Sequence, residues 1–334
     1  MFINFWYVAA LSKDVTTEKP VKSRMLGHEF ALWRDSAGAV HCVSNTCTHR
    51  SGALGAGRVN GDCIECPYHG WTFNGDGDCV RIPSLGRDAA IPDRTRVDAY
   101  PVQEKYGLVH VFLGDLPEAE RPPVIDLPEA TSPEWYGQTF ATDWKVDYKR
   151  SVENTLDPAH NEFVHDTHGF KGRNADYKVA DVHLKETPWG SGFMLPMYAP
   201  KLPDAKMHEA SKRPEASWAE AGSGNHGPNV TWTYIHLSPQ AMFHNITFHT
   251  PVDAMNDRLY VIMYRNFMHD PKNDAEFEKR FWYVADQDRI VLEGMAPTLT
   301  PEHNRHEFLV PSDACVARYR EFCKEWEAKG WRLD

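Results

Sequence analysis

The chain has 334 residues, of which 42% are hydrophobic and 25% are charged, a composition typical of a soluble globular protein. Its length is enough for about two domains with sizeable cores. The formal net charge of −11 argues against a nucleic-acid partner, because phosphate backbones attract basic surfaces.

The N-terminal segment indicates neither a signal peptide nor a membrane span. Residues 1–11 are apolar, but no basic segment accompanies them, and Lys13 and Asp14 follow at once. Five of the seven cysteines lie within residues 42–79, which favours metal binding in a reducing compartment over a disulfide framework. We therefore expect a cytoplasmic protein.

Residues 21–115 are expected to form an all-β domain. Short apolar runs alternate with turn signals in this region. The expected strands lie at 29–33, 40–44, 71–73 and 108–113. The Asn-Gly-Asp-Gly sequence at 74–77 predicts a hairpin.

Two mixed Cys/His pairs lie within this β-rich region. The first pair is Cys47 and His49, and the second, after sixteen intervening residues, is Cys66 and His69. This set suits a [2Fe-2S] cluster in which two Cys hold one iron and two His hold the other. Structural zinc is the alternative, because four Cys and His ligands often bind it. We favour the cluster, since zinc sites normally pair Cys with Cys and His with His.

The pattern C-x-H-x16-C-x2-H resembles that of Rieske proteins. Rieske proteins of respiratory complexes carry two further cysteines, which form a disulfide between the cluster loops. The matching positions here are Gly52 and Tyr68. The resemblance therefore implies the oxygenase or ferredoxin branch, with a potential toward the lower end of the Rieske range.

A proline-rich stretch follows, which interrupts regular structure and is typical of a linker. Its prolines are Pro117, Pro122, Pro123, Pro128 and Pro133. We place a domain boundary near residue 120, between a Rieske [2Fe-2S] domain at 1–120 and a catalytic mononuclear iron domain at 121–334.

Asp157, His160 and His165 form a D-x2-H-x4-H pattern just past the linker. On an ideal helix Asp157 and His160 would be neighbours, whereas His160 and His165 would point about 140° apart. The two imidazoles can bind one ion only where the helix ends or bulges between them. Two histidines at this spacing are more often ordinary surface or core residues.

Together with the upstream motif, this stretch resembles the mononuclear iron motif E/D-x3-D-x2-H-x4-H of Rieske non-heme iron oxygenases, with Glu153 at its first position. The resemblance implies that His160 and His165 are ligands in a facial triad of two His and one carboxylate, with positions open for dioxygen. It makes Asp157 the residue that orients His160 and bridges toward the cluster, and it places Asn154 near the iron. The alternative is that Asp157 only caps or orients the helix.

The third iron ligand is expected on a long helix over 273–295. Its apolar stripe comprises Phe277, Phe281, Val284, Ala285, Val291, Leu292 and Met295. Asp288 falls on this stripe, where a carboxylate is costly unless it is paired or metal-bound. Family members carry this ligand as an Asp followed by an apolar run and a Glu, which the run 288–293 matches. Asp286 and His168 are the alternatives.

Between these segments the chain is mostly strand, with β-rich runs at 230–237, 241–250 and 259–267. The resemblance implies the helix-grip fold of the family, an antiparallel sheet with helices around a concave pocket, so the whole chain is expected to be α+β. Residues 204–229 are expected to be irregular, either a plain surface loop or a substrate lid.

Aromatic and polar residues of this region are expected to line the substrate pocket. They are Trp232, Tyr234, Phe243, His249 and Trp282. His249 lies near a position that some small relatives use for substrate contact.

The resemblance covers the whole chain and is closest to the small oxygenases built from α subunits alone, such as vanillate O-demethylase and dicamba monooxygenase, which form cyclic homotrimers. It implies one [2Fe-2S] cluster and one mononuclear Fe(II) per subunit. The expected function is that of a terminal oxygenase in aromatic compound catabolism. Such an oxidoreductase uses dioxygen, as a monooxygenase or dioxygenase, to hydroxylate or oxidatively demethylate a mostly apolar, aromatic substrate.

The chain has no dinucleotide fingerprint and no plant-type ferredoxin cysteine run. Electrons are therefore expected to come from NAD(P)H through a separate reductase, a ferredoxin or both. The competing interpretation is a non-catalytic Rieske electron-transfer protein, which would not need residues 121–334.

Overall fold

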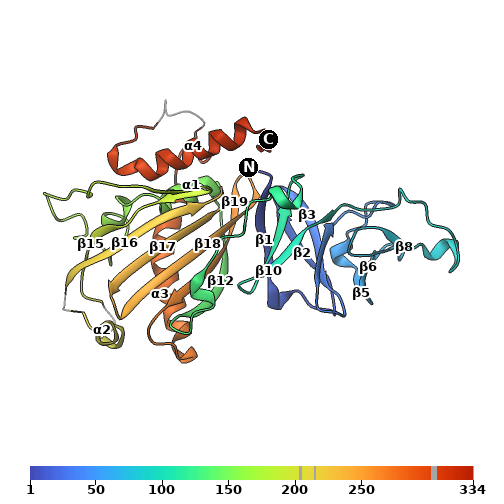
Figure 1. The fold of residues 1–334 in the computed structure, drawn as a ribbon, viewed down its shortest axis with the longest axis horizontal. Coiled ribbons are helices and arrows are strands. Elements are labelled where there is room, and N and C mark those ends of the chain that lie inside the picture. The colour runs from blue at the N-terminus through green and yellow to red at the C-terminus, as the bar shows by residue number, and fades with distance from the viewer. Residues whose placement is uncertain (203–204, 214–215, 302–306, 334) are drawn as a thin grey trace. The chain divides into compact units, whose positions relative to one another are not determined.

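The computed structural model describes residues 1–202, 205–213, 216–301 and 307–333. The chain forms two compact units (Figure 1), and each is described by itself. The N-terminal unit comprises residues 3–121, and the C-terminal unit comprises residues 1–2 and 122–334. The first two residues join the C-terminal unit because the Met1 ammonium donates a hydrogen bond to the Leu333 carbonyl at 3.2 Å.

The N-terminal unit consists of three antiparallel sheets, so the all-β prediction is confirmed. One sheet has the order β1-β11-β10, with strands at Phe5–Leu11, Leu108–Leu113 and Val102–Lys105. The second has the order β2-β3-β4-β9, with strands at Val21–Met25, His28–Arg34, Val40–Ser44 and Ala99–Tyr100. The third has the order β5-β6-β7-β8, with strands at Arg58–Asn60, Cys63–Glu65, Thr72–Phe73 and Cys79–Arg81.

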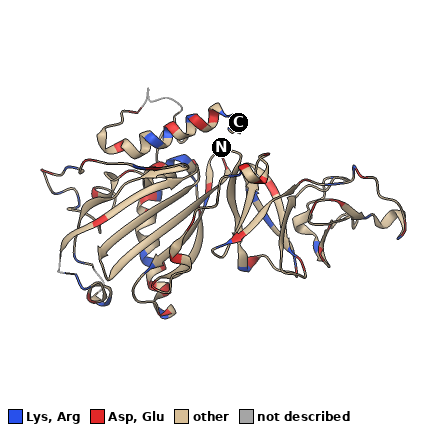
Figure 2. Cartoon of the chain, viewed as in Figure 1, with Lys and Arg blue, Asp and Glu red and all other residues tan. Residues whose placement is uncertain are grey.

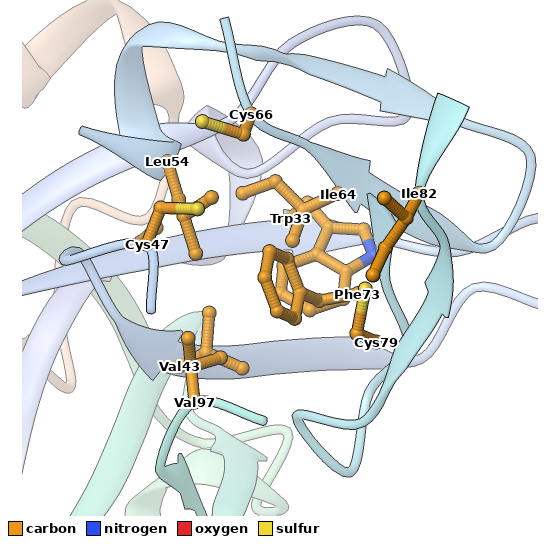
Figure 3. Packing of buried hydrophobic residues seen from close by; sticks show 11 residues of the cluster. Trp33, Val43, Cys47, Leu54, Ile64, Cys66, Phe73, Cys79, Ile82 and Val97 are labelled. Carbon is orange, nitrogen blue, oxygen red and sulfur yellow. The ribbon is translucent and has the colours of Figure 1, made fainter. Parts of the chain in front are cut away.

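One core cluster of the N-terminal unit lies under the loops that carry the Cys/His pairs. Its large, fully buried members are Trp33, Leu54, Ile64 and Phe73. Figure 3 shows Cys47 and Cys66 at one margin of this cluster. The Trp33 indole donates a hydrogen bond to the Asp62 carbonyl at 3.1 Å, which ties the core to a turn between strands. The loops that carry the cysteines are thus anchored on a rigid base.

The C-terminal unit is an eight-stranded antiparallel sheet with helices, as predicted. The path of the sheet is β12-β19-β18-β17-β16-β14-β13, and β15 pairs with β16. The strands β12 to β19 lie at Tyr136–Trp144, Lys185–Thr187, Gly190–Gly192, Leu195–Ala199, Ser217–His226, Val230–Ser238, Ala241–Asp253 and Asn256–Arg265. The helices α1 to α4 lie at Tyr148–Thr155, Ala205–Ser211, Asp274–Glu293 and Ala314–Ala328. Short 3₁₀ turns complete both units.

Strand alternation gives the large sheet two different faces. On one face Ile235 and Phe243 pack in a cluster with Phe277 of α3. On the other face Tyr234 of β17 stacks on its cross-strand neighbour His244, with ring centroids 3.7 Å apart. The face that carries Phe243 is the one that meets α3 and the pocket described below.

The prediction that residues 204–229 are irregular is wrong, because α2 and the ten-residue strand β16 lie there. The glycines of this stretch serve close packing rather than a loop. A Cβ at Gly224 would lie 2.4 Å from the indole of Trp232 on the neighbouring strand. The indole therefore occupies the space that a side chain at position 224 would need.

The predicted helix over 273–295 is present as α3, but its buried stripe is narrower than expected. Phe277, Ala285 and Leu292 are buried, whereas Val291 and Met295 are 47% and 37% exposed. The helix ends at Glu293, so Met295 lies beyond it.

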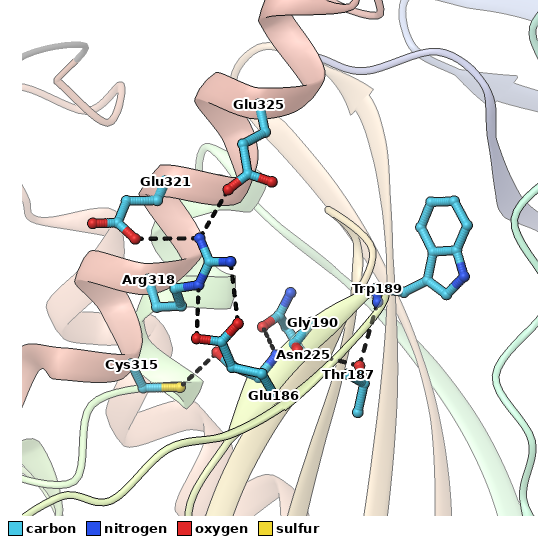
Figure 4. Close-up of polar contacts among 10 residues, drawn as sticks. Glu186, Thr187, Trp189, Gly190, Asn225, Cys315, Arg318, Glu321 and Glu325 are labelled. Atoms are coloured by element: carbon cyan, nitrogen blue, oxygen red, sulfur yellow. Dashed lines mark hydrogen bonds and ion pairs between the residues drawn. The ribbon is translucent and has the colours of Figure 1, made fainter.

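A charged contact joins helix α4 to β13 (Figure 4). The guanidinium of Arg318 donates two hydrogen bonds of 3.2 Å to Glu186, and its third nitrogen reaches Glu321 and Glu325 on its own helix. Figure 2 shows acidic and basic residues interspersed along α4. Among the described residues, no helix has the length and apolarity that crossing a lipid bilayer requires.

Candidate functional site

Three side chains from two distant segments of the C-terminal unit converge on one point. His160 Nε2 lies 3.5 Å and His165 Nε2 lies 3.4 Å from Asp288 Oδ1 of α3. All three potential ligand atoms lie within 4.8 Å of one another. The structure thus brings together the two histidines and the aspartate that the sequence analysis selected as iron ligands.

The two histidines can meet because the helix that precedes them ends early. Helix α1 stops at Thr155, and His160 begins a 3₁₀ turn that ends at residue 162. Pro158 explains the break, since a proline disfavours helical geometry at the residue before it, which is Asp157. The idea that Asp157 and His160 share a helix is therefore wrong. The angle of about 140° expected between the two histidines on an ideal helix does not apply, because both follow the end of α1.

Hydrogen bonds hold the Nδ1 atom of each imidazole, which is the nitrogen that does not point toward Asp288. His160 Nδ1 lies 2.6 Å from the main-chain carbonyl of Asp157, so this nitrogen carries the proton, and the Asp157 carboxylate lies farther away at 3.8 Å. His165 Nδ1 lies 3.1 Å from Gln287 Oε1, and the Gln287 amide donates to Asp166 at 3.0 Å. Both Nε2 atoms therefore keep their lone pairs toward Asp288, as metal ligands must.

The three groups are spaced to bind a metal ion rather than to form hydrogen bonds with one another. Asp288 Oδ1 is buried and, within the part of the chain that the structure describes, has no hydrogen-bond partner, because both nitrogens lie beyond normal hydrogen-bond length. Ligands placed at right angles about 2.1 Å from an ion lie about 3 Å apart, and the two imidazole nitrogens lie 3.5 and 3.4 Å from Asp288 Oδ1. Burial also lowers the pKa of His160, which keeps its imidazole neutral. Two His and one carboxylate form the donor set of non-heme Fe(II) sites.

The two alternative third ligands lie outside this group. Asp286 forms an ion pair with Arg289 at 2.9 Å, and its side chain is 49% exposed. His168 lies beside His165, with ring centroids 4.8 Å apart, and its Nδ1 lies 3.1 Å from the Thr167 hydroxyl. Burial lowers the pKa of His168 to about 3, so this imidazole is neutral. Asp288 therefore remains the carboxylate that we assign to the triad.

The triad opens into a cavity of about 270 Å³, bounded by α1, α3 and strands β15 to β19. Asn154, Asp157, Phe243, His249 and Trp282, which the sequence analysis selected, all line it. An apolar cavity of about 150 Å³ holds a benzene molecule, so this volume suits a substituted ring or a small bicyclic compound.

Two of the predicted pocket residues lie elsewhere. Trp232 and Tyr234 do not line the cavity, because they project from the opposite face of β17 to Thr233 and Ile235, which do. The indole of Trp232 lies against Gly224, as described above. Their selection was wrong because aromatic residues occur on both faces of this strand.

His249 has protein partners at both ring nitrogens. Its Nδ1 lies 2.8 Å from Asp257 Oδ2, and its Nε2 lies 3.2 Å from the Thr231 hydroxyl. The imidazole is 1% exposed. A role for His249 in substrate contact stays a prediction, and the geometry shows it bracing β18 against its neighbours.

The two Cys/His loops of the N-terminal unit share one backbone design. In the first, the Cys47 amide donates to Gly52 O at 2.9 Å, and Cys47 O accepts from Ser51 N at 2.9 Å. In the second, Cys66 makes the same two bonds, to Trp71 O at 2.8 Å and from Gly70 N at 3.1 Å.

The side chains of these loops lie close enough to share one cluster. The rings of His49 and His69 have centroids 4.5 Å apart, and His49 stacks on Trp71 at 4.4 Å. Burial raises the pKa of the Cys47 thiol to about 11, so this sulfur is a thiolate at neutral pH only when a metal binds it. A Cβ at Gly52 would lie 2.8 Å from Cys66 Sγ, so a larger residue there would crowd the site. The residues present fit a [2Fe-2S] cluster.

Some residues of the site were not found from the sequence. Gln287, which holds His165, lies next to Asp288 on α3, but nothing in the sequence links it to a histidine far upstream. Arg213 lines the cavity from a stretch that had been assigned to a loop.

Both units match known protein families. Residues 5–101 match the Rieske [2Fe-2S] domain, and residues 144–329 match the vanillate O-demethylase oxygenase C-terminal domain. The iron-sulfur subunit TsaM1 of the toluene-4-sulfonate monooxygenase system from Comamonas testosteroni is 39% identical over 168 residues, which are 50% of this chain and 48% of that protein. The 3-chlorobenzoate-3,4-dioxygenase oxygenase subunit from the same organism is 32% identical over 187 residues, 55% of this chain and 41% of that protein. The matches therefore span less than half the length of these relatives.

Solved structures share the fold over almost the whole chain. Pseudomonas putida CBB5 NdmA with caffeine has a TM-score of 0.82 at 20% identity, covering 98% of this chain and 92% of that chain. Dicamba monooxygenase bound to dicamba has a TM-score of 0.79 at 22% identity, covering 98% of both chains. At these identities the likeness establishes the fold.

Proposed function

The chain belongs to the family of Rieske oxygenase α subunits, which join a Rieske [2Fe-2S] domain to a vanillate O-demethylase-type oxygenase domain, and from this premise we propose that it is a terminal oxygenase. The observation that carries the proposal is the buried, unpartnered Asp288 Oδ1 facing two imidazole nitrogens at the end of a cavity. The competing function, a non-catalytic electron carrier, needs neither this triad nor this cavity.

In this proposal Cys47, His49, Cys66 and His69 hold the cluster, while His160, His165 and Asp288 hold the mononuclear iron. When bound, the iron supplies activation of dioxygen, and the cluster supplies electrons one at a time. The chain itself keeps the two imidazole Nε2 atoms unprotonated, through the carbonyl of residue 157 and through Gln287.

The cavity walls determine which substrates can reach the triad. The aromatic side chains Phe243, Phe281 and Trp282 line the cavity and exclude water from its apolar part. We propose a mostly apolar, aromatic substrate, which is hydroxylated or oxidatively demethylated. Mass spectrometry of products formed with labelled dioxygen, across a panel of methoxylated and N-methylated arenes, would identify the reaction.

The central test replaces the third ligand. Asp288→Ala should lose the mononuclear iron and turnover while it keeps the visible absorption of the cluster. Asp286→Ala, two residues earlier and exposed, is the matched control and should keep both. The assignment fails if the control loses iron and Asp288→Ala stays active.

The proposal also includes an electron donor, a cellular compartment and a domain boundary. The chain has no nicotinamide-binding fingerprint, so we propose that NAD(P)H supplies electrons through a separate reductase or ferredoxin. The seven cysteines, all within the described residues, form no disulfide, which supports a reducing, cytoplasmic compartment. We also keep the domain boundary near residue 120.

We further propose a homotrimer, in which His69 of one subunit passes electrons to Asp157 and His160 of the next. The Asp157 side chain is 28% exposed, and among the described residues its Oδ2 accepts no hydrogen bond, so it can accept one from an outside imidazole. The alternative is that Asp157 only shapes the turn before His160, since its carboxylate accepts a hydrogen bond from Ala159 N at 2.7 Å.

Subunit exchange distinguishes these two roles. A His69→Ala variant and an Asp288→Ala variant are each expected to be inactive. Mixed assemblies should recover part of the activity, because an intact cluster in one subunit would face an intact iron site in its neighbour. Proven exchange without recovery would rule out the route between subunits.

A further inference from the structure

We propose that Arg213 binds an anionic group of the substrate, a carboxylate or a sulfonate, at the end of the cavity away from the triad. This inference rests on the proposed function, because it assigns the chemical class of the molecule that the same cavity holds.

Arg213 is a buried cation that lines the cavity. It follows α2, and it is 8% exposed. Its Nη2 donates to Ala199 O at 2.8 Å and to Ser217 Oγ at 3.2 Å, and its Nε lies 3.4 Å from the same hydroxyl. Its Nη1 is buried and has no hydrogen-bond partner among the described residues. Neutral oxygens therefore hold the Nε–Nη2 edge of the guanidinium. The third nitrogen, Nη1, is left to donate to a ligand.

The other buried arginines show what Arg213 lacks. Arg150 forms an ion pair with Glu307 at 2.5 Å, and Arg265 forms one with Asp274 at 2.6 Å. Among the described residues, no carboxylate pairs with Arg213. A buried charge without a counter-charge is unfavourable, so a ligand that supplies the negative charge gains binding free energy there.

Carboxylates are unevenly distributed along the described cavity wall. Among its described lining residues the only carboxylates are Asp157 and Asp288, and both belong to the triad end. An anion is thus attracted to the Arg213 end, where the described lining residues include no carboxylate.

The fold separates these two ends. Leu202, just before α2, packs with Phe277 near the start of α3, so the α2 segment covers this end of the helix. Asp288 lies eleven residues after Phe277, which is about 16 Å along a helix axis. The wall between the two ends is largely apolar and aromatic. A ring held by its anionic substituent at Arg213 would therefore point its opposite side toward the triad.

The test measures binding rather than turnover. Calorimetric titration of the holoprotein, without reductase, would use substituted benzoates and benzenesulfonates together with their uncharged carboxamide and sulfonamide counterparts. Wild-type protein should bind the anions at least about tenfold more tightly than the neutral counterparts. Arg213→Gln should weaken anion binding about tenfold to hundredfold and leave the neutral compounds unchanged. Arg213→Lys should fall between, since it keeps the charge but loses the planar fork.

Controls separate this inference from the proposed function. Arg289→Gln removes a partly exposed, ion-paired cation of α3 that does not line the cavity, and it should bind the anions as wild type does. Arg213→Gln should keep the iron and cluster contents of the wild type. An error in the triad assignment would be detected by the metal analysis, whereas an error in the role of Arg213 would be detected by the titration.

Wild-type protein that does not prefer anions, or Arg213→Gln that binds them with unchanged affinity, would overturn the proposal. So would an Arg213→Gln variant that weakens self-association without affecting anion binding, since Arg213 would then pair with a carboxylate of a second copy.

Discussion

Replacing Arg320 with Met should destabilise the C-terminal unit by about 3–5 kcal/mol at neutral pH, because it leaves a buried carboxylate without its partner. Arg320 Nε and Nη2 donate to the two oxygens of Glu153 at 2.7 and 2.6 Å, and the two side chains are only 12% and 9% exposed. Methionine fills much of the same volume but carries no charge. For a unit of this size, about 1 kcal/mol shifts the melting temperature by about 2–4 °C, so we expect a fall of about 6–20 °C.

The loss of stability in the Arg320→Met variant should depend on pH, in a direction set by the pKa of Glu153. Burial raises the pKa of Glu153, and the hydrogen bonds from Arg320 act against that rise, so removing Arg320 should raise the pKa further. A carboxyl whose pKa is higher in the folded state binds its proton more tightly there. It therefore penalises folding above its unfolded pKa of about 4.3, and the penalty grows as the pH rises toward the folded pKa. The deficit of the variant should be largest near pH 8 and should shrink toward pH 5.

Scanning calorimetry of the holoprotein between about pH 5 and pH 8 would measure this deficit. Lys324→Met, at an exposed position of the same helix, controls for the change in side chain and should leave the transition unchanged. Glu153→Leu combined with Arg320→Met should recover most of the stability, because it removes the stranded charge of Glu153, while Glu307, which also accepts from Arg320 at 2.6 Å, keeps its ion pair with Arg150. A deficit that does not vary with pH, or a double variant as unstable as Arg320→Met, would refute the reasoning.

Three further predictions follow from the sites. Gln287→Leu removes the acceptor that holds His165 Nδ1, and it should weaken iron binding about 10- to 100-fold in a chelator competition, whereas Asp286→Asn should not. Gly224→Ala would place a methyl group 2.4 Å from the Trp232 indole and should cost about 1–3 kcal/mol in thermal unfolding, whereas Gly294→Ala, with no contact under 3.4 Å, should be neutral. His69→Cys should move the EPR signal of the reduced cluster away from the Rieske type, and an unchanged spectrum would remove His69 from the ligand set.

The sequence was most informative where ligands lie close together along the chain. Two short loops carry the proposed cluster ligands Cys47, His49, Cys66 and His69. Their spacing in the sequence therefore limits how far apart the side chains of each pair can lie. The α+β architecture was also readable, because strand runs such as 108–113 have strong β propensity and clear turn boundaries.

The sequence was least informative where a side chain has to be assigned to one face of a strand. Both faces of β17 carry aromatic or apolar residues, so alternation does not distinguish Trp232, which faces away from the cavity, from Ile235, which lines it. The partners of Arg213 and Gln287 come from other elements, and only tertiary packing brings them together.

The spacing of the metal ligands along the chain has a consequence for maturation. All four proposed cluster ligands lie between residues 47 and 69 of the N-terminal unit, so this site is complete once that unit has folded. The triad brings together His160 and Asp288, which are far apart in the sequence because strands β13 to β19 lie between them. Forming this contact therefore costs a larger loop-closure entropy. Since domains generally fold in order during synthesis, the cluster site should be ready to receive its metal before the ribosome has released Asp288.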